Sequence, residues 1–221
     1  MTAAPLTIQT FTSSAFGQNA YLVRCSATGA VLAIDPGGDV ESMLASLESM
    51  GARLESIVLT HAHLDHIEGV AALVERAPAP IHLPPDDRPL YDAAAQQAAM
   101  FGYDFPAPPP ADETLEPGRP VTLGRCQFQV RHAPGHSPGH VILYAAEAGL
   151  AFVGDVVFAG SIGRSDLPGG DYQQLMRSIR EQVLTLPDET ELYSGHGPVT
   201  TVGRERVSNP FLIADHPGRW A

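Results

Sequence analysis

Thr60-His61-Ala62-His63-Leu64-Asp65-His66 is the segment from which this 221-residue chain is best interpreted, and it directly follows the apolar residues Ile57-Val58-Leu59. The segment places three imidazoles and one carboxylate within six residues, at the end of a predicted strand. Neutral imidazole and ionised carboxylate are donors that borderline divalent cations such as zinc accept readily. The alternative is a polar loop that is rich in histidine and binds nothing, but further ligand-type residues downstream argue against it.

Three later segments repeat this organisation. In each, a hydrophobic run (residues 128–130, 150–153 and 191–193) ends near glycine and a residue that can bind a metal. The segments are Pro134-Gly135-His136-Ser137-Pro138-Gly139-His140, Val153-Gly154-Asp155 and Ser194-Gly195-His196-Gly197. Glycine lets the backbone turn sharply and approach a bound ion closely. Four strand ends are therefore expected to converge on one site.

On these motifs, the chain resembles the metallo-β-lactamase-fold hydrolases, and within them the glyoxalase II (hydroxyacylglutathione hydrolase) branch. The motifs His-x-His-x-Asp-His, Pro-Gly-His, Gly-Asp and Gly-His occur in the family order. The match extends to Ala33-Ile34-Asp35-Pro36-Gly37 and to residues 158–166, 201–206 and 209–211. Classical members carry a C-terminal helical domain, whereas this chain ends soon after Asn209-Pro210-Phe211. The resemblance is therefore to the short bacterial type that lacks that domain.

The resemblance implies two divalent metal ions, most commonly zinc, with iron or manganese accepted by the same donors. It implies His61, His63 and His136 on the first ion, Asp65, His66 and His196 on the second, and Asp155 bridging both. Asp65 and Asp155 are the expected catalytic carboxylates, because Asp155 joins the two ions and Asp65 orients the attacking hydroxide. All these positions carry the expected residue type.

Two further residues are expected to support the ligands without binding the metal. Asp35 resembles a turn residue by composition, but its family counterpart holds the metal loop. His140 begins the apolar run 141–144, and the ligand set is complete without it. No substrate-binding residue is identified. Tyr91, Phe101 and Tyr103 are candidates for lining the cleft, although packing in the core explains them equally simply.

The expected chemistry is thioester hydrolysis. Two cations can share a water, lower its pKa and present it as a bridging hydroxide to a carbonyl carbon. A substrate such as S-lactoylglutathione would then give an acid and a thiol, and no serine nucleophile motif is found. A mononuclear iron persulfide dioxygenase, using His63, His136 and Asp155, remains an alternative, although such relatives tend to have cysteine at the position of His140. A lactonase with the same ligands also remains open.

The resemblance also separates this chain from other relatives. Class B1 lactamases have cysteine where this chain has Asp155 and arginine where it has His66, which argues against antibiotic hydrolysis. Flavodiiron proteins have glutamate at the position of His63, which argues against electron transfer. A non-enzymatic binding module is disfavoured, because buried ligand side chains without a metal carry a desolvation cost.

Composition limits the partners. The chain has 13 basic and 25 acidic residues and a formal net charge of −12, which disfavours nucleic acid as a partner. No signal segment or membrane-spanning run is recognised, so a cytoplasmic location without a membrane partner is expected. The two cysteines, Cys25 and Cys126, are interpreted as small buried hydrophobes and not as a disulfide. The oligomeric state is left open.

Hydrophobic periodicity predicts alternating strands and helices. Residues 7–11, 21–24 and 31–34 are predicted strands that begin an antiparallel sheet. Asp39 is the predicted N-cap of a helix that ends at Gly51, and residues 67–76 form a second predicted helix. Asp171 is expected to open a third, with an apolar stripe at Tyr172, Leu175, Met176, Ile179 and Val183. Residues 86–100 are predicted to be helical, and residues 105–120 to be a surface connection.

The predicted fold class is α+β. We expect a four-layer αβ/βα sandwich of two mixed β-sheets with helices on the outer faces, formed by residues 1–221 as a single domain. The metal ligands fall on both sides of the proline-rich segment 105–120, so both halves of the chain must close around one site.

Overall fold

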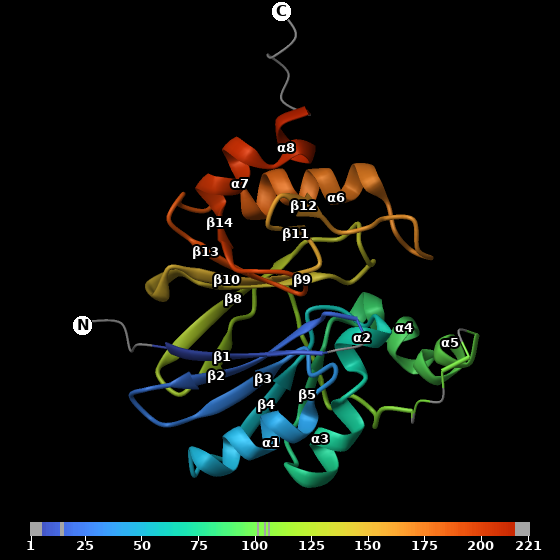
Figure 1. The fold of residues 1–221 in the computed structure, drawn as a ribbon, viewed down its shortest axis with the longest axis vertical. Helices are drawn as coiled ribbons and strands as arrows, with labels where there is room; N and C mark the ends of the chain where they lie inside the picture. Colours follow the sequence, from blue (N-terminus) through green and yellow to red (C-terminus); the bar gives the residue numbers. More distant parts are fainter. Residues whose placement is uncertain (1–5, 14–15, 101, 104, 106, 215–221) are drawn as a thin grey trace, which may run out of the picture.

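A computed structural model describes residues 6–13, 16–100, 102–103, 105 and 107–214. It has two six-stranded mixed sheets that face each other, as Figure 1 shows. The first sheet has the order β1-β2-β3-β4-β5-β6, and the second has the order β14-β13-β10-β9-β8-β7. Helices α1 and α3 cover the outer face of the first sheet, and α6, α7 and α8 cover that of the second (Figure 1). This confirms the predicted four-layer arrangement.

The first sheet begins with three antiparallel strands, as predicted: β1 (Leu6–Thr12), β2 (Asn19–Cys25) and β3 (Val31–Ile34). Its remaining strands, β4 (Leu54–Val58), β5 (Ile81–Leu83) and β6 (Glu113–Thr114), pair in parallel. The second sheet contains β7 (Val121–Leu123), β8 (Cys126–His132), β9 (Val141–Ala145), β10 (Leu150–Gly154), β13 (Glu191–Ser194) and β14 (Thr200–Thr201).

The inner strands of the first sheet, β2, β3 and β4, are largely buried on both faces, and successive side chains along each strand point to opposite sides. In β3, Val31 and Ala33 face a core shared with the helices, whereas Leu32 and Ile34 face the core between the sheets. A third core lies between the second sheet and its helices. The middle core includes Cys25 and Cys126, which are buried with their Sγ atoms 3.4 Å apart and are not joined by a disulfide. This confirms their interpretation as buried, unbridged residues.

The first two helices differ in detail from the sequence expectation. Helix α1 (Val40–Ser49) follows Asp39 as predicted, but Asp39 has φ 60° and its side chain makes no capping hydrogen bond. The second predicted helix is two helices, α2 (Leu64–Ile67) and α3 (Val70–Arg76), separated at Gly69. A side chain at Gly69 would overlap the carbonyl oxygen of Gly37, so the close approach of the two segments requires glycine.

The structure also differs from the sequence expectation for residues 86–100 and 105–120, which connect the two halves of the chain. Residues 86–100 do not form one helix but the 3-10 turn η1 (Pro85–Asp87) and helices α4 (Arg88–Asp92) and α5 (Ala94–Met100). Residues 105–120 are not only a surface connection. They include β6, which extends the first sheet, and the buried side chains of Phe105 and Leu115. Hydrogen bonding to β5 and hydrophobic burial explain why this proline-rich segment is ordered here.

The remaining helices cover the second sheet. Asp171 caps α6 (Tyr172–Ser178) by accepting a hydrogen bond from the Gln174 amide, as predicted. The predicted stripe is buried except for Tyr172, which is 46% exposed, and it continues through a π-helical turn, η3 (Ile179–Val183). A 3-10 turn, η2 (Ala146–Ala148), the hairpin of β11 (Val157–Phe158) and β12 (Ser161–Ile162), and helices α7 (Val202–Ser208) and α8 (Pro210–Ala214) complete the order. Among the described residues, no helix is long and apolar enough to cross a membrane.

Candidate metal centre

The four ligand-bearing loops meet at one edge of the two sheets. The loop of His61 follows β4 of the first sheet, whereas those of His136, Asp155 and His196 follow β8, β10 and β13 of the second. A hydrogen bond of 2.9 Å from the Val141 amide to the Thr60 carbonyl joins the sheets at this edge. The site therefore depends on both halves of the chain being correctly packed.

Asp35 holds the first loop. One carboxylate oxygen accepts a 2.6 Å hydrogen bond from the Thr60 amide, and the other accepts a 2.6 Å bond from the Thr60 hydroxyl. The second oxygen also lies 3.0 Å from His66 Nδ1, so the ring donates there and directs Nε2 into the site. Asp35 adopts φ 47°, a left-handed conformation that Asp tolerates better than most residues. Both oxygens of Asp35 are thus engaged by the protein, although one of them also lies within 4.8 Å of a ring nitrogen of His61 and of His66.

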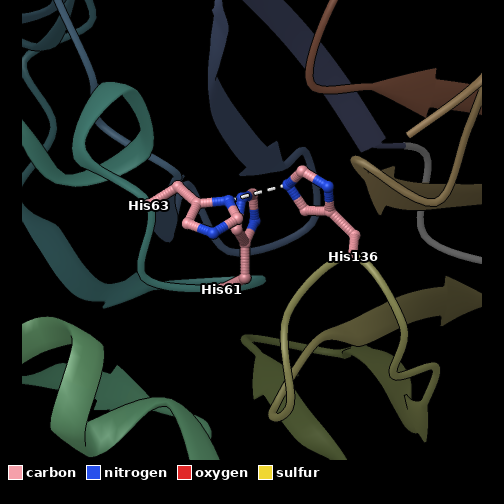
Figure 2. Close-up of side chains that lie close together, drawn as sticks. All are labelled: His61, His63 and His136. Carbon is pink, nitrogen blue, oxygen red and sulfur yellow. Dashed lines mark hydrogen bonds between the residues drawn. The ribbon is translucent and has the colours of Figure 1, made fainter. Parts of the chain in front are cut away.

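His61, His63 and His136 form the first group of donors (Figure 2). All three are buried, and one ring nitrogen of each lies within 4.8 Å of the others. His136 Nδ1 donates to the Arg164 carbonyl at 2.7 Å, so its Nε2 carries the lone pair. His136 Nε2 lies 2.8 Å from His63 Nδ1, and Figure 2 shows the two rings pointing toward each other. The group has the geometry of a three-histidine metal site.

Asp65, His66 and His196 form the second group, and their donor atoms also lie within 4.8 Å of one another. The Asp65 carboxylate is 3.1 Å from His196 Nε2 and 3.8 Å from His66 Nε2. His66 is fully buried, whereas the side chain of Asp65 is 20% exposed. The second group is therefore the more accessible side of the centre.

Asp155 lies between the two groups. One of its oxygens is 3.4 Å from His136 Nε2 and 3.5 Å from His196 Nε2, and the other is 3.2 Å from His66 Nε2. The side chain thus contacts both sets of histidines. A single carboxylate in this place is able to share its two oxygens between two cations.

The two groups differ in their protonation in the metal-free protein. Burial lowers the pKa of His61 well below its ordinary value and that of His63 to about 3, so these rings are neutral. Burial also acts on His66 and His196, but neighbouring Asp155 and Asp65 outweigh it. They raise the pKa of His66 well above its usual range and that of His196 to about 9. The first group is ready to bind a cation, whereas the second holds protons that a cation must displace.

Several buried donor atoms have no hydrogen-bond partner in the described structure. They include His61 Nε2, His66 Nε2 and Asp155 Oδ1; the last two lie 3.2 Å apart, and the rings of His61 and His66 have centroids 4.0 Å apart. An unsatisfied buried polar atom costs about 1–3 kcal/mol, and three in one place would be a large defect in a folded protein. Divalent cations would satisfy all of them, so the residues present fit metal binding.

His140 supports the centre from behind. Its buried ring stacks on His61 with centroids 4.7 Å apart, and its Nε2 accepts a 3.0 Å hydrogen bond from the Asp155 amide. This hydrogen bond holds the backbone of the residue that joins the two groups. His140 Nε2 is therefore engaged by the protein, whereas its buried Nδ1 has no hydrogen-bond partner among the described residues.

The structure brings together the seven predicted ligands, with Asp35 and His140 beside them. Three more residues that the sequence interpretation missed hold the loops. Asn19 donates to the Ser194 and Gly197 carbonyls, Gln18 donates to the Asp35 carbonyl, and Asp87 accepts hydrogen bonds from two ligand loops. All three are buried polar residues outside any motif. Gln18 and Asn19 directly precede an apolar run, whereas Asp87 lies among prolines and charged residues and carries no such signal in the sequence.

The candidates for lining a cleft separate clearly. Tyr91 is buried and donates from its hydroxyl to the Pro109 carbonyl, so it is a packing residue. Tyr103 is 41% exposed and lies beside Phe16, with ring centroids 5.9 Å apart. Phe101 lies outside the described residues.

Comparison with known proteins agrees with this centre. A model of the metallo-β-lactamase superfamily matches residues 14–196. Hydroxyacylglutathione hydrolase GloC of Haemophilus influenzae is 37% identical over 209 residues, which cover 94% of this chain and 98% of that protein. The crystal structure of TTHA1623 in a di-iron-bound form is 45% identical with a TM-score of 0.84, covering 92% of this chain and 100% of that one.

A second solved structure is also similar. The BLEG-1 B3 metallo-β-lactamase is 37% identical with a TM-score of 0.86, and the match covers 93% of this chain and 99% of that one. The matched family model spans most of the chain and includes all seven converging donors, the last of which, His196, is also the last matched residue. The chain therefore belongs to the metallo-β-lactamase superfamily and is a metal-dependent hydrolase.

Proposed function

We propose that this protein is a dinuclear hydrolase that cleaves a thioester such as S-lactoylglutathione to a carboxylic acid and a thiol. In this proposal, His61, His63 and His136 bind the first ion, Asp65, His66 and His196 bind the second, and Asp155 binds both. The observation that carries it is the position of Asp155, whose oxygens lie 3.2–3.5 Å from histidine nitrogens of both groups.

The metal ions, when bound, would acidify a water and polarise the substrate carbonyl. The protein residues then position and exchange protons. Asp65 is the carboxylate that solvent reaches, so it is placed to orient the attacking water and to pass a proton to the departing sulfur. Water adds to the acyl carbon and gives up a proton. The carbon–sulfur bond breaks, and the departing sulfur takes up a proton to form the thiol. This route needs no serine or cysteine nucleophile.

The substrate class is supported by the hydroxyacylglutathione hydrolase name of the relative GloC, which matches nearly the whole chain. Zinc is the proposed metal, because the donors are nitrogen and oxygen with several imidazoles. Iron is the main competitor, since the similar TTHA1623 was solved in a di-iron-bound form. We also propose that the protein acts in the cytoplasm on a small-molecule thioester.

The test combines metal analysis with an activity assay. Protein purified without added metal should contain about two metal ions per chain, and it should hydrolyse S-lactoylglutathione with loss of thioester absorbance. Asp155→Asn should lower kcat/KM by on the order of 1,000-fold, because it removes the shared ligand. Asp86→Asn changes an exposed residue outside the site and should leave kcat/KM unchanged. Wild-type enzyme loaded with two metals but inactive on thioesters would refute the proposed substrate class.

A second candidate is β-lactam hydrolysis, which the similarity to the BLEG-1 B3 metallo-β-lactamase favours. The sequence argument against antibiotic hydrolysis compared this chain with class B1 only, through Asp155 and His66. Parallel assays on a β-lactam, a lactone and glutathione persulfide with oxygen uptake separate the alternatives. Turnover of a β-lactam at a higher kcat/KM than any thioester would replace the main proposal. One iron per chain with oxygen uptake would instead indicate the dioxygenase.

A further inference from the structure

Asp87 is the buried carboxylate that joins the two loops of the first histidine group. It ends the short turn η1, a segment that belongs to no recognised motif, and its side chain is fully buried. One carboxylate oxygen accepts hydrogen bonds from the Ala62 amide at 3.0 Å and the Ser137 hydroxyl at 2.7 Å. The other accepts from the Gly139 amide at 2.6 Å.

These donors come from opposite sides of the centre. Ala62 lies between His61 and His63 on the loop after β4, whereas Ser137 directly follows His136 on the loop after β8. The first loop belongs to one sheet and the second to the other. The Asp87 side chain thus joins the loop that carries His61 and His63 to the loop that carries His136.

The contact is too close to be incidental. A side chain at Gly139 would place its first carbon 2.6 Å from the Asp87 nitrogen and 2.9 Å from a carboxylate oxygen. Only glycine lets the loop approach the carboxylate this closely. Burying an ion is expensive unless it is hydrogen-bonded, and three donors compensate Asp87. Such an arrangement is costly for a residue that only packs against its neighbours.

We propose that Asp87 is a positioning residue for the first metal ion. By holding the Ala62 amide, the Ser137 hydroxyl and the Gly139 amide together, it fixes the spacing between His61 and His63 on one loop and His136 on the other. The histidines are thereby arranged before the metal arrives. This inference rests on the ligand assignment of the proposed function, but not on the thioester substrate.

The test measures binding of Co²⁺ to each site without any substrate. A His196→Ala background removes a ligand of the second ion, so the visible absorption of added Co²⁺ reports the first site. In that background, Asp87→Asn keeps the size of the side chain but presents an amide N–H to at least one donor. We expect Co²⁺ affinity at the first site to fall by about 10- to 100-fold, the usual effect of removing a partner that orients ligands. Asp86→Asn is the matched control and should leave the affinity unchanged.

A second variant covers the possibility that Asp87→Asn does not fold. Ser137→Ala removes only one of the three donors, and we expect a smaller but measurable loss of first-site affinity with the Co²⁺ absorption bands shifted. The complementary His136→Ala background reports the second site, which Asp87→Asn and Ser137→Ala should leave within about twofold.

The outcomes are distinct. Equal weakening of both sites by these variants, or no weakening at the first site in folded protein, would overturn the positioning role. Wild-type protein that binds two Co²⁺ ions but cleaves no thioester would refute the proposed substrate and leave the Asp87 inference standing. Melting temperatures of the metal-free variants identify any general loss of stability.

Discussion

A metal ion must displace protons from His66 and His196 but not from His61 and His63. Burial keeps His61 and His63 neutral. His66 and His196, in contrast, lie beside the carboxylates of Asp65 and Asp155. The carboxylates hold protons on the second group in the metal-free protein. Binding at the two sites should therefore depend differently on pH.

We predict that the second metal ion releases more protons than the first. At pH 7 the first ion meets neutral imidazoles, but the second must displace protons from His66 and His196, whose pKa values are raised, that of His196 to about 9. Affinity at the second site should rise with pH to at least about 9, because both His66 and His196 must lose a proton and both have raised pKa values. Calorimetric titrations in two buffers of different ionisation enthalpy measure the release. Equal release at both steps would contradict the prediction.

The same residues predict how the stability of the metal-free protein depends on pH. The pKa of His63 is lowered to about 3, so below about 6.5 the unfolded chain binds more protons at this residue, and stability falls as pH decreases toward 3. The pKa of His196 is raised to about 9, so its contribution is fully present below about 6.5 and is lost as pH rises through 9. Metal-free stability should be highest near pH 6.5.

Thermal melts in the presence of a chelator between pH 4 and 10 check this dependence. His196→Ala should weaken the decline on the alkaline side, where His66 still contributes, and keep the decline on the acid side. A curve that is flat from pH 5 to 9 would show that the two groups do not titrate as their surroundings indicate.

The convergence of the seven donor residues could be predicted from the sequence because their spacing repeats a known pattern of residue types. Asp35 and His140 could be placed beside them for the same reason. Asp87 and Asn19 could not, because each is one polar residue without a motif, and its role depends on contacts with distant loops. Their partners become neighbours only when the two sheets pack.

The secondary-structure elements position the ligands at strand ends, where glycine lets neighbouring chains approach closely. Strands β1, β2 and β3 were predictable from short hydrophobic runs separated by polar turns, and α6 from its cap and apolar stripe. The break between α2 and α3 was not, because the apolar pattern continues across Gly69, whereas in the structure the Gly69 amide donates to the Pro36 carbonyl of a distant loop. Strand β6 was missed because its two residues pair with β5 but carry no apolar signal.

Gly195 at the end of β13 provides the prediction for these strand ends. A side chain there would overlap an oxygen of Asp155 and lie 2.6 Å from His66 Cε1. Gly195→Ala should therefore displace the carboxylate that faces both groups and lower kcat/KM by on the order of 100-fold. Hydrolysis assays and metal analysis of the purified variant measure the effect.

Gly149→Ala is the matched control for this variant. Gly149 has φ 67° but open space around it, so alanine adds backbone strain of about 1–2 kcal/mol and no contact with the centre. It should lower the melting temperature and leave kcat/KM unchanged. A Gly195→Ala protein with full activity would show that the site tolerates displacement of Asp155.

At the scale of the whole molecule, the candidate metal centre lies where the two sheets meet. The first sheet supplies His61, His63, Asp65 and His66, and the second supplies His136, Asp155 and His196. A hydrophobic core between the sheets already joins them in the metal-free protein. The metal ions should therefore add to an existing interface, and we propose that the chain unfolds as one cooperative unit.

Metal removal tests this arrangement. A ligand that binds only the folded state at 100 times its Kd adds about 2.7 kcal/mol of stability, and each kcal/mol corresponds to about 2–4 °C in a domain of this size. Chelation should lower the melting temperature by about 5–11 °C while preserving a single transition, because the core between the sheets remains. Asp155→Asn should show a smaller shift on chelation, since it binds metal less well at the outset. Two separate transitions after chelation would instead mean that the metal ions, and not the core between the sheets, couple the two halves of the chain.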